Sequence, residues 1–335
     1  MHEVESRPVP PVTDPGIPTL PAVLRPGELS QHLQGVLPIQ WGTLHEVRVG
    51  VLVHHPGSRC TLEMALRMTG GWHDLIGKVY SEDRLDVYLA MEQIKRAGFG
   101  PEEEYSIPDP IHFVSGLRLL LLEKVQGPLA QDLFLKGNER DRAVASGRCA
   151  RWLARFHALA PKTGTVLDLN NHLICLERWS RRIGKLGEPV AGKAARLFSR
   201  LEAAASKLDG MEMSAGHASY GPAQIILSPG RTVTFDWDGY DVAHPGRDVA
   251  RFMIALRRVA LGRLQSIRAL DAEAELFLKT YVDASHAGAV TDLPFYQAAV
   301  CLRLAKYNLS HQVSRWKDKL EAMLDEGIRI SEGWR

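Results

Sequence analysis

The chain has 335 residues, of which 45% are hydrophobic and 24% charged, a composition that suits a globular protein and excludes collagen-like, low-complexity and fully disordered classes. The 41 lysines and arginines nearly balance 39 acidic residues, and at a net charge of +2 we expect no nucleic-acid partner. Four widely spaced cysteines without a CxxC pair favour a reducing compartment over a disulfide framework or a zinc site. Without a signal-peptide segment or an apolar run of membrane-spanning length, we expect a cytoplasmic protein with no membrane partner.

Residues 1–35 form a proline-rich arm, with seven prolines between Pro8 and Pro26. Proline lacks a backbone N–H and fixes φ, so the arm is predicted to contain neither a regular helix nor a central strand. Two interpretations remain open. The arm is either a loose tail with polyproline character or a strap docked on the domain or on a partner.

The segment 36–125 is predicted to be a small α+β unit. A valine-rich alternation followed by the turn residues 56–59 predicts a hairpin, and further short apolar runs predict additional strands. Apolar positions with a period near 3.6 predict a helix at 81–97 that Gly98 ends. The predicted strands cover 45–55, 60–68, 75–80, 111–114 and 117–125.

From residue 126 to residue 335 the sequence is predicted to be mainly helical. The clearest helix is 142–159, where Cys149, Trp152, Leu153 and Phe156 have the spacing of one apolar helix face. One β-like island at 224–240 interrupts the helices and contains a turn at 228–230. The other predicted helices are 189–208, 248–261, 264–287 and 294–324.

Lys78 lies within an otherwise apolar strand, where an ammonium group is costly unless it finds an anion. Glu92 follows fourteen residues later in the predicted helix. A strand lysine held by a helix glutamate is the arrangement with which kinases bind the α- and β-phosphates of a nucleotide. Two alternatives remain open: Glu82 as the partner, or a lysine on an edge strand that extends to solvent.

A second group of polar residues spans the β-like island. A loop beginning at His217 enters a strand, a hairpin follows, and the returning strand ends in Asp236 and Asp238. Such a hairpin can present an amide oxygen, here that of Gln224, and a carboxylate to one Mg²⁺ ion. Asp248, just before an apolar helix, is expected to be its N-cap or a buried anchor.

These motifs, in this order, resemble the aminoglycoside phosphotransferase family, small-molecule kinases that share the protein-kinase fold. The family pattern is roughly H-G-D-x-x-x-x-N, a hairpin, I-D-W-E, and then G-D-P-x-x-D-L-A. His217 falls on its histidine, Asp236-Trp237-Asp238 on D-W-E, and Pro245 with Asp248-Val249-Ala250 on its end. Upstream, 155–159 resembles the L-H-x-L helix end and 121–129 the segment that joins the two lobes. The resemblance covers about residues 45 to 325.

The resemblance implies a bilobal α+β fold: an N-lobe at 36–125 with a five-stranded antiparallel sheet and one helix, and a helical C-lobe at 126–335 that contains the active-site hairpin. ATP or GTP would bind beneath the segment that holds Glu123 and Val125. Lys78, oriented by Glu92, would hold its phosphates. Asp236, helped by Gln224, would bind Mg²⁺, and Ser219 and His217 would belong to the catalytic loop.

This sequence also departs from the family pattern. Ser219 stands where the family has its catalytic aspartate, and Gln224 where it has a metal-binding asparagine. Ala218 replaces a glycine and His244 an aspartate. A serine hydroxyl is no ready general base near neutral pH, so turnover is in doubt while nucleotide binding stays plausible; Asp238 or Asp241 could substitute for the base.

Two functional hypotheses follow. The first is an ATP- or GTP-dependent phosphotransferase that acts on a hydroxyl of a small molecule, with altered base catalysis. The second is a pseudokinase whose cleft binds a nucleotide or metabolite and whose surface binds a protein partner. A polycationic aminoglycoside needs an acidic pocket, whereas this chain carries a basic stretch in its helical half. That stretch suits either an anionic acceptor or a solvated helix face, and comprises Arg178, Arg181, Arg182 and Lys185.

Overall fold

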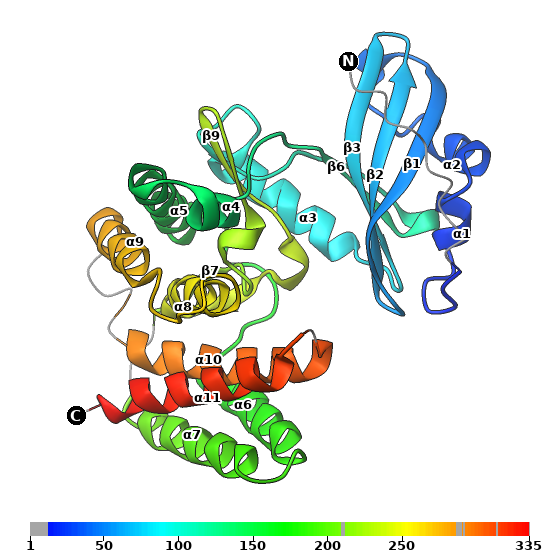
Figure 1. Ribbon diagram of the computed structural model, residues 1–335. Coiled ribbons are helices and arrows are strands. Elements are labelled where there is room, and N and C mark those ends of the chain that lie inside the picture. The colour runs from blue at the N-terminus through cyan, green and yellow to red at the C-terminus, as the bar shows by residue number, and fades with distance from the viewer. Residues whose placement is uncertain (1–12, 209–211, 286–289, 291, 313, 335) are drawn as a thin grey trace. The chain divides into compact units, whose positions relative to one another are not determined.

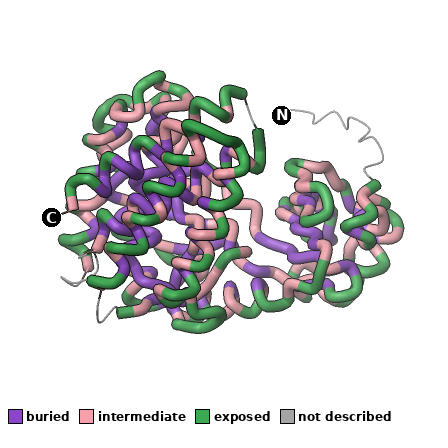
Figure 2. The backbone as a smooth tube through the Cα atoms, turned by 90° about the horizontal axis from the view of Figure 1, so that it is seen from below, coloured by how far each residue is buried: buried purple, intermediate pink, exposed green. Residues whose placement is uncertain are grey.

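The computed structural model describes residues 13–208, 212–285, 290, 292–312 and 314–334, and Figure 1 shows its helices and strands. Contacts between residues divide the chain into two compact units. Unit 1 comprises the residues up to Glu102 together with Ser106–Gln126, and unit 2 comprises Glu103–Tyr105 together with Gly127–Arg335. Buried residues gather in the interior of each unit (Figure 2).

Unit 1 is built on a five-stranded antiparallel sheet with the strand order β1-β2-β3-β6-β5, as predicted. The period-two pattern is clearest in β2, where every second side chain from Cys60 to Met68 is buried. Each predicted strand is present, although β3 begins four residues earlier than expected. The strands are β1 Leu44–His55, β2 Arg59–Met68, β3 Gly71–Tyr80, β5 Pro110–Val114 and β6 Leu119–Glu123.

The helix predicted at 81–97 is shorter in the structure and changes character near its end. Helix α3 spans Leu85–Ile94, and one π-helical turn continues it over Lys95–Phe99. Gly98 has φ of 97°, a left-handed conformation that ends the helix as the sequence predicted.

The described part of the proline-rich arm is helical and packed, which corrects the prediction that it holds no regular helix. Helices α1 Leu20–Val23 and α2 Pro26–Leu33 have a proline in their first turn, where no N–H is needed. Their apolar residues belong to the same core cluster as the sheet, so these two helices are part of unit 1. Residues 13–33 are therefore docked rather than loose, whereas Pro8, Pro10 and Pro11 lie outside the described residues.

Unit 2 is mainly helical, as expected. Helix α5 begins at a reciprocal cap, in which the Asn138 side chain accepts the Asp141 N–H and the Asp141 carboxylate accepts the Asn138 N–H. Its predicted apolar face is fully buried. The described helices of four or more turns are α5 Glu139–Leu159, α6 Leu169–Gly184, α7 Val190–Ala205, α8 Gly246–Arg263, α10 Leu293–His311 and α11 Trp316–Glu332; α4 Ala130–Lys136 and α9 Asp271–Ala284 are shorter.

The helical predictions for unit 2 need three corrections. Helices α4 and α6 were missed. The predicted helix 264–287 is α9 only, because Gln265 takes a left-handed conformation and ends the preceding helix. The predicted helix 294–324 is two helices, because Gln312 and Arg315 are both left-handed. In Figure 1, α10 and α11 lie side by side over α6 and α7.

The predicted β-like island is a hairpin followed by a short irregular segment. Strands β8 Ile225–Ser228 and β9 Arg231–Thr234 pair antiparallel, and β4 Tyr105–Ser106 flanks β9. A 3₁₀ turn at Trp237–Gly239 leads to β10 Asp241–Ala243, which pairs with β7 Ser214–Gly216. Within the described residues, no helix is both long and apolar enough to span a membrane.

Candidate active site

The loop 217–224 connects β7 to the β8–β9 hairpin and includes two of the predicted catalytic residues. Ala218, immediately before Ser219, has φ of 63°, and Asp236 after β9 has φ of 73°. Non-glycine residues adopt this left-handed conformation at a cost of about 1–2 kcal/mol. Backbone strain of this kind concentrates at functional sites, and here it occurs at Asp236 and at the residue before Ser219.

His217 joins this loop to the segment that carries Asp236. Its Nε2 lies 3.0 Å from the carbonyl oxygen of Phe235, and its Nδ1 lies 3.1 Å from Oγ of Ser219. Because a carbonyl oxygen only accepts hydrogen bonds, Nε2 carries the proton. Burial lowers the pKa of His217, so the ring is neutral and Nδ1 accepts from the Ser219 hydroxyl.

Gln224 is held next to the same strand by backbone contacts. Its carbonyl oxygen accepts the Phe235 N–H at 3.0 Å, and the neighbouring residues Ile225 and Thr234 pair in the hairpin. Gln224 is therefore linked directly to Phe235, the residue before Asp236, and Ser219 is linked to it through His217. The predicted metal ligands Gln224 and Asp236 lie at the same end of the hairpin.

The donor chemistry of Asp236 and Gln224 fits a magnesium ion. Mg²⁺ is usually held by one or two protein oxygens together with phosphates and water, and a carboxylate and an amide are oxygen donors of this kind. A site built wholly from protein side chains is not indicated, because the described residues contain no cluster of three or more His, Cys, Asp and Glu that could hold a metal.

Asp248 holds the first residue of the loop through a hydrogen bond. Its Oδ2 accepts the backbone N–H of His217 at 2.6 Å, and it lies fully inside the unit in the first turn of α8. Helix α8 begins at Gly246, so Asp248 is the buried anchor of the two predicted roles and not the N-cap. Burial opposes ionisation of Asp248, but Arg247 and His157 outweigh it and hold the pKa of the carboxyl below its usual range.

A cluster of aromatic side chains also packs against the loop. Trp237 packs at 4.6 Å from the His217 ring and also contacts Trp152 and Phe156. The hydroxyl of Tyr220 donates to the Cys149 carbonyl at 2.7 Å. Trp152 is a core residue as predicted, and the buried His157 hydrogen-bonds Tyr281 at 2.8 Å. Trp316 lies half-buried at the start of α11, beside a surface pocket.

In unit 1, Lys78 is only 7% exposed on β3, the central strand of the sheet. Its neighbours in register are Thr61 on β2 and Leu120 on β6. The alternative of an edge-strand lysine extending to solvent is therefore wrong. Glu92 lies on α3 and pairs with Arg96 at 3.0 Å, whereas the alternative partner Glu82 is exposed.

Glu123 ends β6, the strand next to β3. Its carboxylate accepts the N–H of Asp109 at 3.1 Å, and its own N–H donates to the Asp109 carbonyl at 2.9 Å. Val125 follows half-buried in the segment that leads out of unit 1. The predicted site residues are divided between the two units. Unit 1 contains Lys78, Glu92, Glu123 and Val125, and unit 2 contains His217, Ser219, Gln224 and Asp236.

A cavity of about 190 Å³ opens beside the loop 217–224 within unit 2. Its wall includes Ala218 of the loop, His172 and Trp179 of α6, and Arg303 of α10. Arg303 donates to the carbonyl oxygen of Ala218 at 2.6 Å, so this arginine holds the loop directly. Sequence reasoning missed Arg303, and the only signal for it was a cation within an apolar helix.

The predicted basic stretch lies on α6, and its four cations are exposed. Arg181 pairs with Glu177 at 2.6 Å on the same helix face. This agrees with the interpretation as a solvated helix face, although Trp179 of the same helix lines the small cavity.

Comparisons with known proteins agree on the architecture. A scan against protein-family models and a search of curated proteins both return no match. Among solved structures, a choline/ethanolamine kinase family protein from Mesorhizobium loti is 13% identical, with a TM-score of 0.57, and the match covers 91% of this chain and 94% of that one. Choline kinase LicA from Streptococcus pneumoniae is 15% identical with a TM-score of 0.61, covering 91% of this chain and 98% of that chain.

A thermostable mutant of aminoglycoside phosphotransferase APH(4)-Ia, in ternary complex with ADP and hygromycin B, is 15% identical with a TM-score of 0.62, and the match covers 88% of this chain and 97% of that one. This chain has the same kinase-like fold. The resemblance noted in the sequence is thereby confirmed at the level of the fold, an α+β architecture that aminoglycoside phosphotransferases share with the choline/ethanolamine kinase family.

Proposed function

We propose that this protein is a phosphotransferase that uses ATP or GTP with Mg²⁺ to phosphorylate a hydroxyl group of a small molecule. One observation carries the proposal. Phe235 accepts from the His217 ring and donates to the Gln224 carbonyl, so the loop 217–224 is held against the residue that precedes Asp236. A backbone strained at Ala218 and Asp236 is costly and is expected where chemistry requires it.

In this proposal each unit contributes distinct groups. Lys78, oriented by Glu92, holds nucleotide phosphates, and the segment with Glu123 and Val125 contacts the base. Asp236 and Gln224 hold Mg²⁺, which supplies charge neutralisation on the phosphates when bound. Phosphoryl transfer has a loose transition state, so positioning and electrostatics carry most of the rate enhancement.

Ser219 would receive the acceptor hydroxyl. As that hydroxyl loses its proton, Ser219 Oγ takes it and passes its own proton to Nδ1 of His217. Burial keeps His217 a weak base. A positioned general base contributes roughly 10²–10⁴-fold, so we expect a slow enzyme rather than an inactive one.

The structural neighbours support this class of reaction. One of them was solved with ADP and hygromycin B, and others are choline kinase family proteins, so a nucleotide donor and a small-molecule acceptor are consistent with the fold. The acceptor of this protein is proposed to be anionic or neutral. All four cysteines are free thiols, in keeping with the proposed cytoplasmic location.

The alternative is a pseudokinase that binds a nucleotide or metabolite and regulates a protein partner. The observation that favours it is Ser219 in the position of the expected aspartate, with its hydroxyl proton donated to His217. The two functions differ in turnover and not in binding.

A thermal-shift scan with ATP, GTP and ADP, with and without Mg²⁺, tests the proposal. We expect a nucleotide to raise the Tm in a Mg²⁺-dependent manner, and Asp236→Ala to abolish the metal dependence while Asp238→Ala retains it. If no nucleotide shifts the Tm under any metal condition, the phosphotransferase is excluded, and only a pseudokinase that binds a metabolite instead would be left. Binding without transfer of the γ-phosphate to any of a panel of small-molecule alcohols would favour the pseudokinase.

A further inference from the structure

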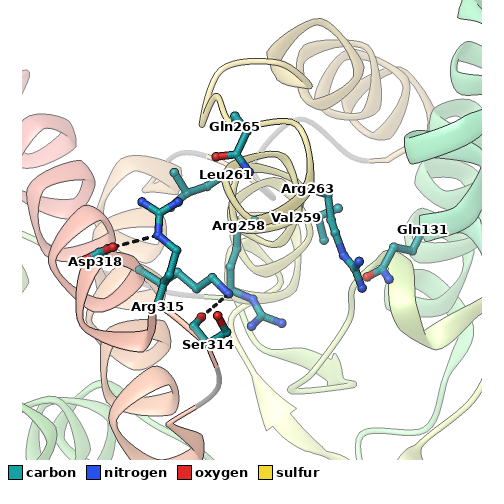
Figure 3. Close-up of a pocket in the computed structure, with 11 residues that line it drawn as sticks. Gln131, Arg258, Val259, Leu261, Arg263, Gln265, Ser314, Arg315 and Asp318 are labelled. Atoms are coloured by element: carbon teal, nitrogen blue, oxygen red, sulfur yellow. Dashed lines mark hydrogen bonds and ion pairs between the residues drawn. The ribbon is translucent and has the colours of Figure 1, made fainter.

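A second and larger pocket lies in unit 2, apart from the small cavity beside the catalytic loop. It is formed by the C-terminal half of α8, by α4 and by the connection between α10 and α11 (Figure 3). Its volume of about 610 Å³ falls within the range of roughly 300–1,000 Å³ typical of small-molecule sites. The charged residues of its wall are Arg258, Arg263, Arg315, Lys319 and Asp318.

Acidic side chains compensate only part of this positive charge, and Arg258 also stacks over the Tyr307 ring, 5.1 Å from its centroid. The one carboxylate, Asp318, pairs with Arg315 at 3.0 Å, and the two side chains turn toward each other in Figure 3. Lys319 donates to the Ser314 carbonyl at 2.8 Å and has no acidic partner among the described residues. Arg263 extends toward Gln131 and, in the described part of the chain, has no hydrogen bond or ion pair.

Two arginines on α8 hold buried nitrogen atoms that lack an acceptor. Within the described residues, Nε of Arg258 and both Nε and Nη1 of Arg251 are buried without a hydrogen-bond partner. Such donors cost about 1–3 kcal/mol each, or more when charged. Arg258 is in the wall of the pocket, so an anion bound there would offset part of the cost at Arg258, whereas Arg251 lies about two turns earlier on α8 and does not line the pocket. Burial lowers the pKa of both guanidinium groups, and the charge of Arg303 adds to the effect on Arg251, whose pKa falls to about 9.

The cations form a row that starts at the catalytic loop. Arg303 donates to the Ala218 carbonyl, one residue before Ser219, and its charge acts on Arg251. A Cβ on Gly221 of the loop would lie 3.4 Å from Cβ of Ala255 on α8. With 3.6 residues per turn, Arg251, Ala255 and Arg258 share one face of α8, so the row runs past the loop and into the pocket.

We infer that this pocket binds the anionic end of the phosphoryl acceptor, a small molecule that carries two or more phosphate or carboxylate groups. Describing the ligand as the acceptor rests on the proposed function, whereas the anion site rests on the pocket and on Arg263 and Lys319, which have no acidic partner among the described residues. The hydroxyl to be phosphorylated would point back along the row toward Ser219.

The binding test uses calorimetry in magnesium-free buffer with EDTA. Fructose 1,6-bisphosphate represents the phosphate class and citrate the carboxylate class, with fructose as the uncharged comparison. We expect one of the anions to bind at least tenfold more tightly than fructose, and Arg258→Gln and Arg263→Gln each to weaken it about tenfold, the usual effect of losing a charge-assisted hydrogen bond. Arg263 is exposed, so R263Q tests the site without risk to the core.

A matched control is Arg140→Gln, which removes an exposed cation at the start of α5 that does not line the pocket. Anions that bind no better than fructose, or an equal loss in R140Q, would overturn the inference. ADP–Mg²⁺ affinity, measured separately, distinguishes the two proposals. Normal ADP binding without anion binding refutes the inference alone, whereas variant-sensitive anion binding by a protein that binds no nucleotide refutes the proposed function and the acceptor role together.

Discussion

The hydroxyl of Ser219 lies 3.1 Å from Nδ1 of His217, while Nε2 of the same ring lies 3.0 Å from the Phe235 carbonyl oxygen. The carbonyl fixes the tautomer, so the serine can only donate to the ring. The loop thus contains a hydroxyl and a weakly basic imidazole where a carboxylate base would be expected from the resemblance. Under the proposed function, we expect this pair to limit the rate of phosphoryl transfer.

Restoring a carboxylate is therefore expected to raise turnover. Ser219→Asp should increase the rate of phosphoryl transfer by up to about 10²–10⁴-fold, the usual contribution of a positioned general base. Ser219→Asn has nearly the same shape without the charge and should not increase it. The measurement is initial-rate transfer from labelled ATP or GTP to the acceptor. Equal rates for S219D and S219N would show that the missing base is not what limits this protein.

The lysine in the sheet of unit 1 makes a separate prediction about nucleotide affinity. Lys78→Met should weaken ADP binding by about tenfold or more, because a buried ammonium is costly unless it binds an anion. If Glu92 acts only by orienting Lys78, Glu92→Gln should add nothing to K78M, so a double-mutant cycle should give strong coupling. Isothermal titration with ADP and Mg²⁺ measures each step.

Arg96→Gln is the control for this cycle. Arg96 is exposed and pairs with Glu92 at 3.0 Å, so R96Q removes a known partner of Glu92 without touching Lys78. Surface ion pairs contribute little, and we expect unchanged ADP affinity. Additive effects of K78M and E92Q would contradict the orienting role.

Much of the fold could be predicted because its local patterns agree with its tertiary contacts. The alternation along β2 and the apolar stripe on α5 each report one buried face directly. The helix ends at Gln265, Gln312 and Arg315 could not be predicted, because glutamine and arginine have no preference for a left-handed backbone. The arm was misjudged because proline at the first turn of a helix favours the helix instead of preventing it.

The candidate site was predictable only where residues follow each other closely. Gln224 and Asp236 flank one hairpin, so their proximity follows from the turn between its strands, whereas His217 lies in the preceding loop and reaches Phe235 through its ring. Arg303 contacts the loop from a helix 85 residues further along the chain, a relationship that only the tertiary fold creates. The same applies to the pocket at Arg258, whose wall combines three separate segments.

His172 predicts how stability depends on pH. Burial, with help from Arg247 and Arg303, lowers its pKa from 6.5 to about 3. In the unfolded chain His172 therefore binds a proton near pH 6.5, whereas in the folded protein it stays neutral at that pH. The free energy of unfolding accordingly decreases as the pH falls below 6.5. At pH 5 the loss from this group alone is about 2 kcal/mol.

Replacing the ring tests this dependence. His172→Phe keeps an aromatic ring against Phe295 and Tyr296 but cannot be protonated. Urea unfolding at pH 7 and pH 5 should show a smaller difference in H172F than in the original chain. His311→Phe, at an exposed position on α10, should leave the difference unchanged. The same pH dependence in H172F would show that His172 is protonated in the folded state.

Ala218 provides the last prediction, because its left-handed backbone lies at φ of 63° next to Ser219. Glycine adopts this conformation freely, so Ala218→Gly should raise the free energy of unfolding by up to about 1 kcal/mol despite the greater flexibility of the unfolded chain. Ala215→Gly, in buried strand β7, should instead lower it. Urea unfolding measures both. If A218G destabilises as much as A215G does, the loop is not strained at this residue, and the strain argument for the site fails.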